Sequence, residues 1–293
     1  MKFTVHQLSR QGGRAMNQDR VGYCHTREAA LFAVADGLGG HPEGEVAADM
    51  VLQTLAAQFR HQADPALQDP RDFLMQALGA AHQRLIHYAA RRRMADAPRT
   101  TIVACLLQGG AAYWAHCGDS RLYLVRADAL VLRTRDHSHL ELHAALSRAP
   151  PAGQRVSRHS LFTCLGSSGA PLIDVAGPTA LQQGDRLLLC SDGLWDGLGD
   201  PHIAARMAAP DLAHAVTGLV DEALQRGGAN CDNVTALALQ WEGDTPLLPL
   251  LPLSVGDMVG SLAADADGLD DAETDRAHGE IDGTPRHAPR RKP

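Results

Sequence analysis

Short apolar runs, separated by small groups of turn-forming residues, dominate the pattern of hydrophobic and polar positions. Runs that are apolar at every position, such as "LFAVA" at 31–35, are typical of buried strands. Most connections are short and contain turn residues, for example "QGG" at 108–110, which favours antiparallel hairpins. We therefore predict strands at 2–8, 20–25, 30–35, 100–107, 110–117, 121–126, 130–133, 172–176, 185–190 and 233–241.

Three longer segments repeat apolar residues with helical spacing. They predict helices at 43–60 and 70–92 and a helical region at 201–227 that Pro210 interrupts. Because the strands come in runs and the helices in pairs, the order favours an α+β fold rather than strict alternation. Two antiparallel sheets packed together, with helices on their outer faces, fit this order.

Composition and charge divide the chain near residue 242. The 293 residues are 45% hydrophobic, enough for one large or two ordinary domains with a core. Residues 1–242 are close to neutral, so nothing indicates a nucleic-acid surface. The segment "TPLLPLLPL" follows. It is expected to be a linker, a segment that packs on the body of the protein, or a docking segment. Residues 261–293 are rich in Ala, Asp, Gly and Pro and are expected to be disordered.

The six cysteines form no CxxC pair and mostly lie in or beside apolar runs, which favours reduced thiols packed as small hydrophobes. The first ten residues, "MKFTVHQLSR", contain no apolar signal core. No apolar run reaches the roughly 18 residues that a membrane span needs. We therefore expect a soluble cytoplasmic protein without a membrane span, and a monomer by default.

Five aspartates lie at predicted strand ends, four of them directly beside Gly, Asn or Ser. A single aspartate at such a place is ordinarily an Asx turn. If the strands are neighbours, however, several carboxylates converge, repel one another and raise one another's pKa values unless cations lie between them. Oxygen ligands favour hard divalent cations such as Mg²⁺ or Mn²⁺. The five residues are Asp19, Asp36, Asp119, Asp192 and Asp232.

Six motifs that contain or flank these aspartates resemble those of the metal-dependent protein phosphatase family, protein phosphatase type 2C. The resemblance implies a four-layer α/β/β/α sandwich with a two-metal site at one end of the sheets. It covers residues 3–241, so we expect a catalytic domain at 1–242 and a linker with an acidic tail at 243–293. The motifs, in the family's order, are "GGRAMNQD" (12–19), "AVADGLGGHPEGE" (33–45), "AHCGDSRLY" (115–123), "TRDHS" (134–138), "LLLCSDGLWD" (187–196) and "CDNVTALAL" (231–239).

The resemblance also implies a role for each matching residue. Asp36 would bridge both metals and Gly37 would offer its backbone carbonyl to the first metal. Asp192 and Asp232 would complete the second site, which Asp19 would reach directly or through water. A weaker third metal would be held by Asp119 and Asp196, and Arg14 would bind the substrate phosphate. The implied cofactors are therefore two or three Mn²⁺ or Mg²⁺ ions.

Two positions depart from the family pattern. In eukaryotic members, a histidine that is proposed as general acid occupies the position of Leu38. Bacterial relatives commonly have an apolar residue there, as this chain does. The residue that donates the proton is therefore open. His41 is an accessory candidate for that role, or a structural loop residue. Gln18 stands where many members have glutamate. Because the glutamine amide is neutral, the site has one negative charge fewer beside the metals.

The leading hypothesis is a phosphatase of phosphoserine and phosphothreonine proteins that opposes a bacterial-type kinase. A phosphatase of small phosphoesters and a non-catalytic phosphoprotein binder on the same fold are the alternatives. Residues 139–170 correspond to the family's variable flap beside the site, where loops usually set selectivity. There Arg148, Arg155 and Arg158 would meet acidic or phosphorylated substrate, or belong to a solvated loop.

Overall fold

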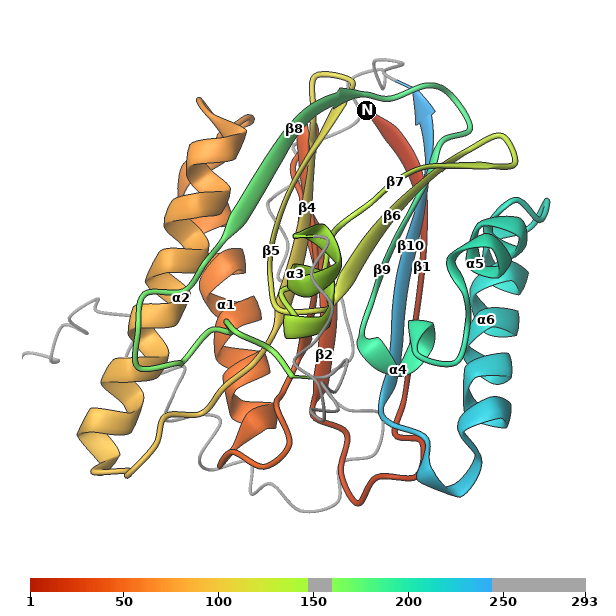
Figure 1. Cartoon of the computed structure of the whole chain (residues 1–293). Helices are drawn as coiled ribbons and strands as arrows, with labels where there is room; N and C mark the ends of the chain where they lie inside the picture. Colours follow the sequence, from red (N-terminus) through yellow and green to blue (C-terminus); the bar gives the residue numbers. More distant parts are fainter. Residues whose placement is uncertain (147–159, 244–293) are drawn as a thin grey trace, which may run out of the picture. The chain divides into compact units, whose positions relative to one another are not determined.

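The computed structural model describes residues 1–146 and 160–243. The three flap arginines, the apolar proline-containing segment and the acidic tail lie outside these residues. Within the described ranges, ten antiparallel strands form two sheets of five (Figure 1). The first has the order β1 (Lys2–Arg10), β10 (Val234–Gly243), β9 (Arg186–Cys190), β6 (Arg121–Arg126) and β7 (Ala129–Arg133). The second has the order β2 (Asp19–His25), β3 (Ala29–Asp36), β4 (Ile102–Gln108), β5 (Ala111–Cys117) and β8 (Asp174–Ala180).

The sheets pack face to face, and this explains the continuous apolar runs. In β3, Phe32 and Val34 belong to the core between the two sheets. Their neighbours Leu31 and Ala33 belong to a second core beneath the helices. Successive strand residues point to opposite faces, so a strand covered on both faces needs apolar residues throughout. The run at 31–35 is therefore the mark of an inner layer.

Helices cover the outer face of each sheet (Figure 1). α1 (Gly44–Gln62) and α2 (Pro70–Arg92) pack on the second sheet, and α5 (Asp200–Met207) and α6 (Leu212–Gly227) lie beside the first. α2 begins at the expected place because Asp69 caps it, accepting from the amides of Arg71 and Asp72 at 2.9 and 3.0 Å. The predicted helices and the break at Pro210 are confirmed, as is the four-layer α+β sandwich.

Three short elements were not predicted: α3 (His139–Ala145), α4 (Asp192–Trp195) and a 3₁₀ turn (Gly228–Asn230). Segments of three to seven residues are too short to show a helical period. α3 also buries none of its residues, so its sequence carries no apolar stripe. α4 begins at Asp192, one of the predicted site residues, with Ser191 between it and the end of β9.

The described residues include all of the cysteines, as well as helices that could be considered as membrane spans. All six cysteines lie there, and each is buried as a free thiol. Among the described helices, none combines the length and the apolar character needed to cross a bilayer.

Candidate active site

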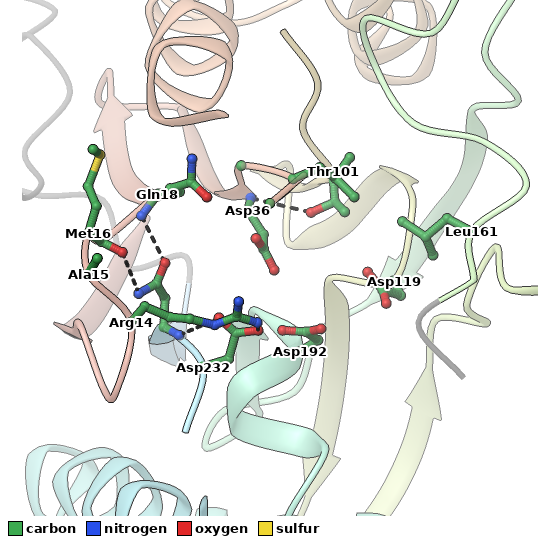
Figure 2. A pocket seen from close by; sticks show the side chains of 14 residues that line it. Arg14, Ala15, Met16, Gln18, Asp36, Thr101, Asp119, Leu161, Asp192 and Asp232 are labelled. Atoms are coloured by element: carbon green, nitrogen blue, oxygen red, sulfur yellow. Dashed lines mark hydrogen bonds and ion pairs between the residues drawn. The ribbon is translucent and has the colours of Figure 1, made fainter. Parts of the chain in front are cut away.

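The predicted aspartates meet at one end of the two sheets. Asp36 ends β3 and Asp19 begins β2, and the antiparallel register makes them direct partners. Like charges on opposed strand positions destabilise a sheet unless something compensates them. Figure 2 shows Asp36 and three further aspartates around a pocket of about 300 Å³. The lining includes Arg14, Gln18, Asp36, Gly37, Leu38, Asp119, Asp192 and Asp232.

Each sheet contributes part of this set. Asp192 follows β9 and Asp232 lies just before β10, and β9 and β10 are neighbours in the first sheet. Asp119 lies in the turn between β5 and β6, where the chain crosses from the second sheet to the first. The pocket therefore depends on the packing of the two sheets against each other.

Burial and the neighbouring carboxylates raise the pKa values of Asp36 and Asp19. Burial, followed by the charges of the neighbouring aspartates, raises the pKa of Asp36 well above its ordinary value. Burial is also the main cause that raises the pKa of Asp19 to about 7, against an opposing hydrogen bond from Ser191 Oγ at 2.7 Å. The other oxygen of Asp19, Oδ1, is buried and has no hydrogen-bond partner. An unpartnered carboxylate oxygen among other carboxylates fits a divalent cation.

The backbone at Gly37 also fits this chemistry. A Cβ at this position would lie 2.3 Å from the carbonyl oxygen of Gly44, so only glycine can occupy it. The Gly37 amide donates to the carbonyl of Gln18 at 3.2 Å, and Thr101 Oγ1 accepts from the Asp36 amide at 3.3 Å. The donor set is thus oxygen-only and held in place, which suits Mg²⁺ or Mn²⁺ rather than a soft metal.

Arg14 reaches the same pocket from the loop between β1 and β2. Its guanidinium donates to Asp232 Oδ2, and this hydrogen bond is the main cause that raises the Arg14 pKa. The Arg14 side chain is about half exposed, at 55%. A permanently charged, planar donor group at the mouth of a pocket can bind a phosphoryl group through two parallel hydrogen bonds.

Sequence reasoning missed Asn233, which holds the Arg14 loop. Its Nδ2 donates to the carbonyls of Gln11 at 2.8 Å and Met16 at 3.0 Å, on either side of Arg14. Its Oδ1 accepts from the amide of Gln18 at 2.8 Å. The asparagine next to Asp232 in "CDNVT" was the available signal, but its partners lie more than 200 residues away and are not visible in the sequence.

Three predicted residues, Asp19, His41 and Asp196, are not part of the described pocket lining. Asp19 is buried beside Asp36, its register partner. Asp196 is exposed at the end of α4. The Nδ1 atom of His41 lies 2.8 Å from Asp96, which also accepts from Arg99 at 2.8 Å. Gln18 does line the pocket, and its Nε2 donates to Glu45 at 3.1 Å.

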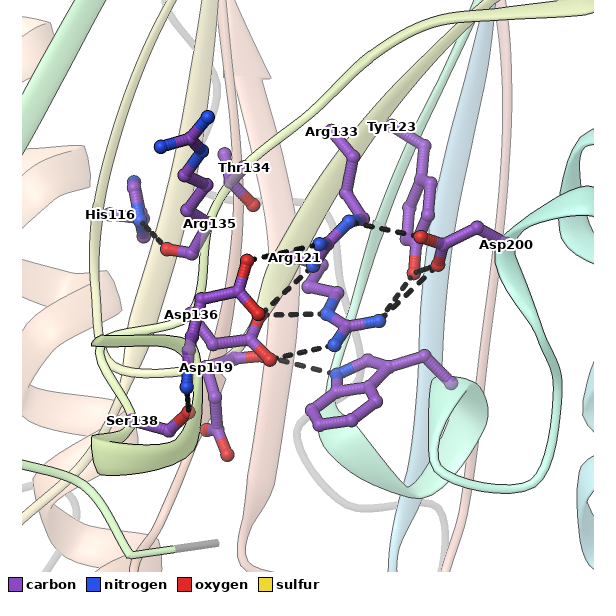
Figure 3. Close-up of polar contacts among 12 residues, drawn as sticks. His116, Asp119, Arg121, Tyr123, Arg133, Thr134, Arg135, Asp136, Ser138 and Asp200 are labelled. Atoms are coloured by element: carbon purple, nitrogen blue, oxygen red, sulfur yellow. Dashed lines mark hydrogen bonds and ion pairs between the residues drawn. The ribbon is translucent and has the colours of Figure 1, made fainter. Parts of the chain in front are cut away.

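A second feature that sequence reasoning left without a role is the network around Arg121 (Figure 3). Its guanidinium donates to both oxygens of Asp136 at 2.6 and 2.7 Å and stacks 3.5 Å from the Trp195 ring. Trp195 Nε1 donates to the backbone carbonyl of Asp119 at 3.0 Å. Arg121 therefore fixes α4, which begins at Asp192, against the turn that carries Asp119. Arg121 and Asp136 belong to the motifs "GDSR" and "TRDHS".

Comparison with known proteins places these features in a family. A family model described as protein phosphatase 2C matches residues 7–225. Serine/threonine protein phosphatase PstP of Mycobacterium tuberculosis is 33% identical over 231 residues, which cover 76% of this chain and 42% of PstP. The match thus spans less than half the length of that relative.

Two solved structures are similar over most of the described fold. The crystal structure of the serine/threonine phosphatase PstP/Ppp of Mycobacterium tuberculosis has a TM-score of 0.70 and 31% identity, and covers 82% of this chain and 99% of the solved chain. The catalytic domain of PstP in complex with two manganese ions has a TM-score of 0.67 and 30% identity, with coverages of 81% and 97%.

Proposed function

The chain belongs to the protein phosphatase 2C family, and from this membership we propose that it removes phosphate from phosphoserine and phosphothreonine in proteins. The membership confirms the resemblance carried by the sequence motifs. The observation that carries the proposal is the convergence of four aspartates and Arg14 on one pocket. A pocket with acidic walls and a single guanidinium suits an anionic substrate only when cations are also present.

The residues divide between cation and phosphate binding. Asp36, Gly37, Asp192 and Asp232, with Asp19 behind them, would hold two Mn²⁺ or Mg²⁺ ions. Bound cations would supply Lewis acidity, which polarises the phosphoryl oxygens and makes water nucleophilic near neutral pH. Asp119 and Asp196 would hold a weaker third ion.

Arg14 orients the phosphoryl group. It would leave Asp232 and donate both sides of its guanidinium fork to phosphoryl oxygens, which would hold the phosphorus in a fixed position for attack by water. Met16 and Leu161, which also line the pocket, provide apolar walls for the peptide around the phosphorylated residue. No His, Lys, Cys or Tyr lines the described pocket, so the proton for the leaving oxygen comes from water.

The proposal also covers the domain limits, the location and the partners of the protein. We place the catalytic domain at residues 1–242, with the linker and tail at 243–293. The protein acts as a cytoplasmic monomer on substrates of a cognate kinase. Small phosphoesters are the competing substrate class, because the pocket has polar groups for a phosphate and few for anything else. The retained aspartates argue against a non-catalytic phosphoprotein binder.

Hydrolysis of a phosphothreonine peptide in the presence of Mn²⁺ tests the activity. Asp36→Asn should lower kcat/KM by about two to three orders of magnitude, because it removes one of the carboxylates that would hold the cations. Asp128→Asn, in the exposed turn between β6 and β7, is the matched control and should keep wild-type activity. Equal turnover by wild type and Asp36→Asn would disprove the mechanism. Higher kcat/KM for nucleotide or sugar phosphates than for the peptide would assign the protein to small phosphoesters.

A further inference from the structure

Two buried histidines and an aspartate meet beside the turn that carries Asp119. His116 in β5 and Asp174 at the start of β8 are direct partners in the antiparallel register. His137, in the segment between β7 and α3, stacks on His116 with ring centroids 4.5 Å apart. Both histidines are at most 4% exposed, whereas the Asp174 side chain is 55% exposed. None of the three has a role in the proposed reaction.

The hydrogen bonds of each ring define its tautomer. His116 Nε2 lies 2.8 Å from the carbonyl of Arg135, which can only accept, so Nε2 carries the proton and Nδ1 does not. The Gly118 amide donates to His137 Nδ1 at 3.2 Å, so in the neutral ring the proton of His137 is on Nε2. His137 Nε2 lies 3.3 Å from Asp174 Oδ2, within ion-pair distance but without the geometry of a hydrogen bond. Burial also lowers the pKa of His116, which favours its neutral form.

The same side chains place three metal-binding atoms within 4.8 Å of one another. Two histidines and a carboxylate are ligands that transition metals accept. However, a neutral histidine that binds metal through Nε2 must carry its proton on Nδ1. In His137 that proton would face the Gly118 amide, so two donors would oppose each other. The hydrogen bonds therefore favour a proton, not a metal, on His137 Nε2.

The bond from Gly118 connects this cluster to Asp119. Gly118 has φ +109°, and a Cβ there would lie 2.7 Å from the Thr101 side chain, so the turn has no freedom on that side. On the other side, His137 binds both polar groups of Gly118: Nδ1 accepts from its amide, and the His137 amide donates to its carbonyl at 2.9 Å. The next residue, Asp119, is 3% exposed and faces the pocket.

We propose that His137 is a positioning residue for Asp119, and that Asp174 keeps His137 in the tautomer this requires. The negative charge of Asp174, 3.3 Å away, favours the proton on His137 Nε2, which leaves the Nδ1 lone pair for the Gly118 amide. The inference rests on the proposed function in one respect, since Asp119 is taken to contribute to the third cation site.

Calorimetric titration of the full-length protein with Mn²⁺ tests this assignment in wild type, His137→Leu, His137→Asn and Asp174→Asn. In His137→Leu the third, weakest Mn²⁺ should bind about tenfold less tightly, while the first two stay within about twofold of wild type. In His137→Asn, Oδ1 occupies the place of Nδ1 and accepts from Gly118, so affinity should return to within about threefold of wild type. Asp174→Asn should give an intermediate loss. His87→Leu, on the exposed side of α2, is the matched control.

Nitrogen NMR of histidine-labelled protein reads the tautomer directly, without any dependence on turnover or folding rate. It should show an unprotonated Nδ1 and a protonated Nε2 in His137. A protonated Nδ1 would overturn the proposal, as would unchanged third-site affinity in His137→Leu or an equal loss in both His137 variants. Zn²⁺ binding that Asp174→Asn abolishes and Asp36→Asn retains would assign the cluster to a metal instead. Because Mn²⁺ binding and nitrogen shifts are measured, failure of the phosphatase activity would appear separately, in the Asp36→Asn assay.

Discussion

Without divalent cations, the fold should be less stable at alkaline pH than at mildly acidic pH, and Asp19 should account for a measurable part of the difference. Its pKa is about 7 in the folded protein and ordinarily 3.8. The folded state therefore holds this proton more tightly than the unfolded state. The resulting stability is fully present below the unfolded pKa and is lost as the pH rises through about 7.

The size of the effect follows from the two pKa values. A shift of about 3 units corresponds to about 4 kcal/mol over the whole titration. Between about pH 5.5 and about pH 8, roughly half of this is expressed, or about 2 kcal/mol in the free energy of unfolding. Asp36, whose pKa is also raised, adds to the difference in the same direction.

Urea unfolding in EDTA at the two pH values measures this difference. In Asp19→Asn, which cannot ionise, it should shrink by about 2 kcal/mol. Asp128→Asn, on the surface, should keep the wild-type value. Adding Mn²⁺ to wild type should raise the free energy of unfolding more at about pH 8 than at about pH 5.5, because protons compete with the cation for the carboxylates. The same pH dependence in Asp19→Asn and wild type would refute the reasoning.

Three further substitutions test parts of the site. Gly37→Ala places a methyl group against the Gly44 carbonyl and should cost about 1–3 kcal/mol in unfolding free energy, with weaker Mn²⁺ binding by calorimetry. Arg121→Met leaves the buried Asp136 carboxylate without its bidentate partner and should cost about 3–5 kcal/mol by urea unfolding; a cost under about 1 kcal/mol would contradict the importance of this pair. Asn233→Asp removes both donors that hold the Arg14 loop, and steady-state kinetics should show a KM for phosphopeptide raised about tenfold.

The layers of the fold could be predicted because a strand that is buried on both faces is apolar at every position of the sequence. Phe32 and Val34 face one core and Leu31 and Ala33 another, so the run has no polar interruption. α3 and α4 contain no comparable apolar pattern in their sequences. Their existence depends on where the flanking segments place them, and α3 has no buried face at all.

The site was predictable to the extent that each residue belongs to a motif. The aspartates at strand ends could be recognised together, and the strand register brings Asp19 and Asp36 face to face. The supporting residues could not be recognised, because their roles are defined by distant partners. Asn233 acts on carbonyls near the other end of the chain, and His137 acts through the backbone of Gly118.

The pairing of the first and last described strands has a consequence for biosynthesis. β1 lies beside β10, with Lys2 opposite Gly243 and Arg10 opposite Val234, and Asp232 lies two residues before the start of β10. While the chain is still emerging from the ribosome, the first sheet lacks the strand that joins β1 to β9, and the pocket lacks one of its carboxylates. Contacts of such sequence separation form late. A nascent or prematurely terminated chain that ends before β10 therefore has an incomplete first sheet and an incomplete pocket.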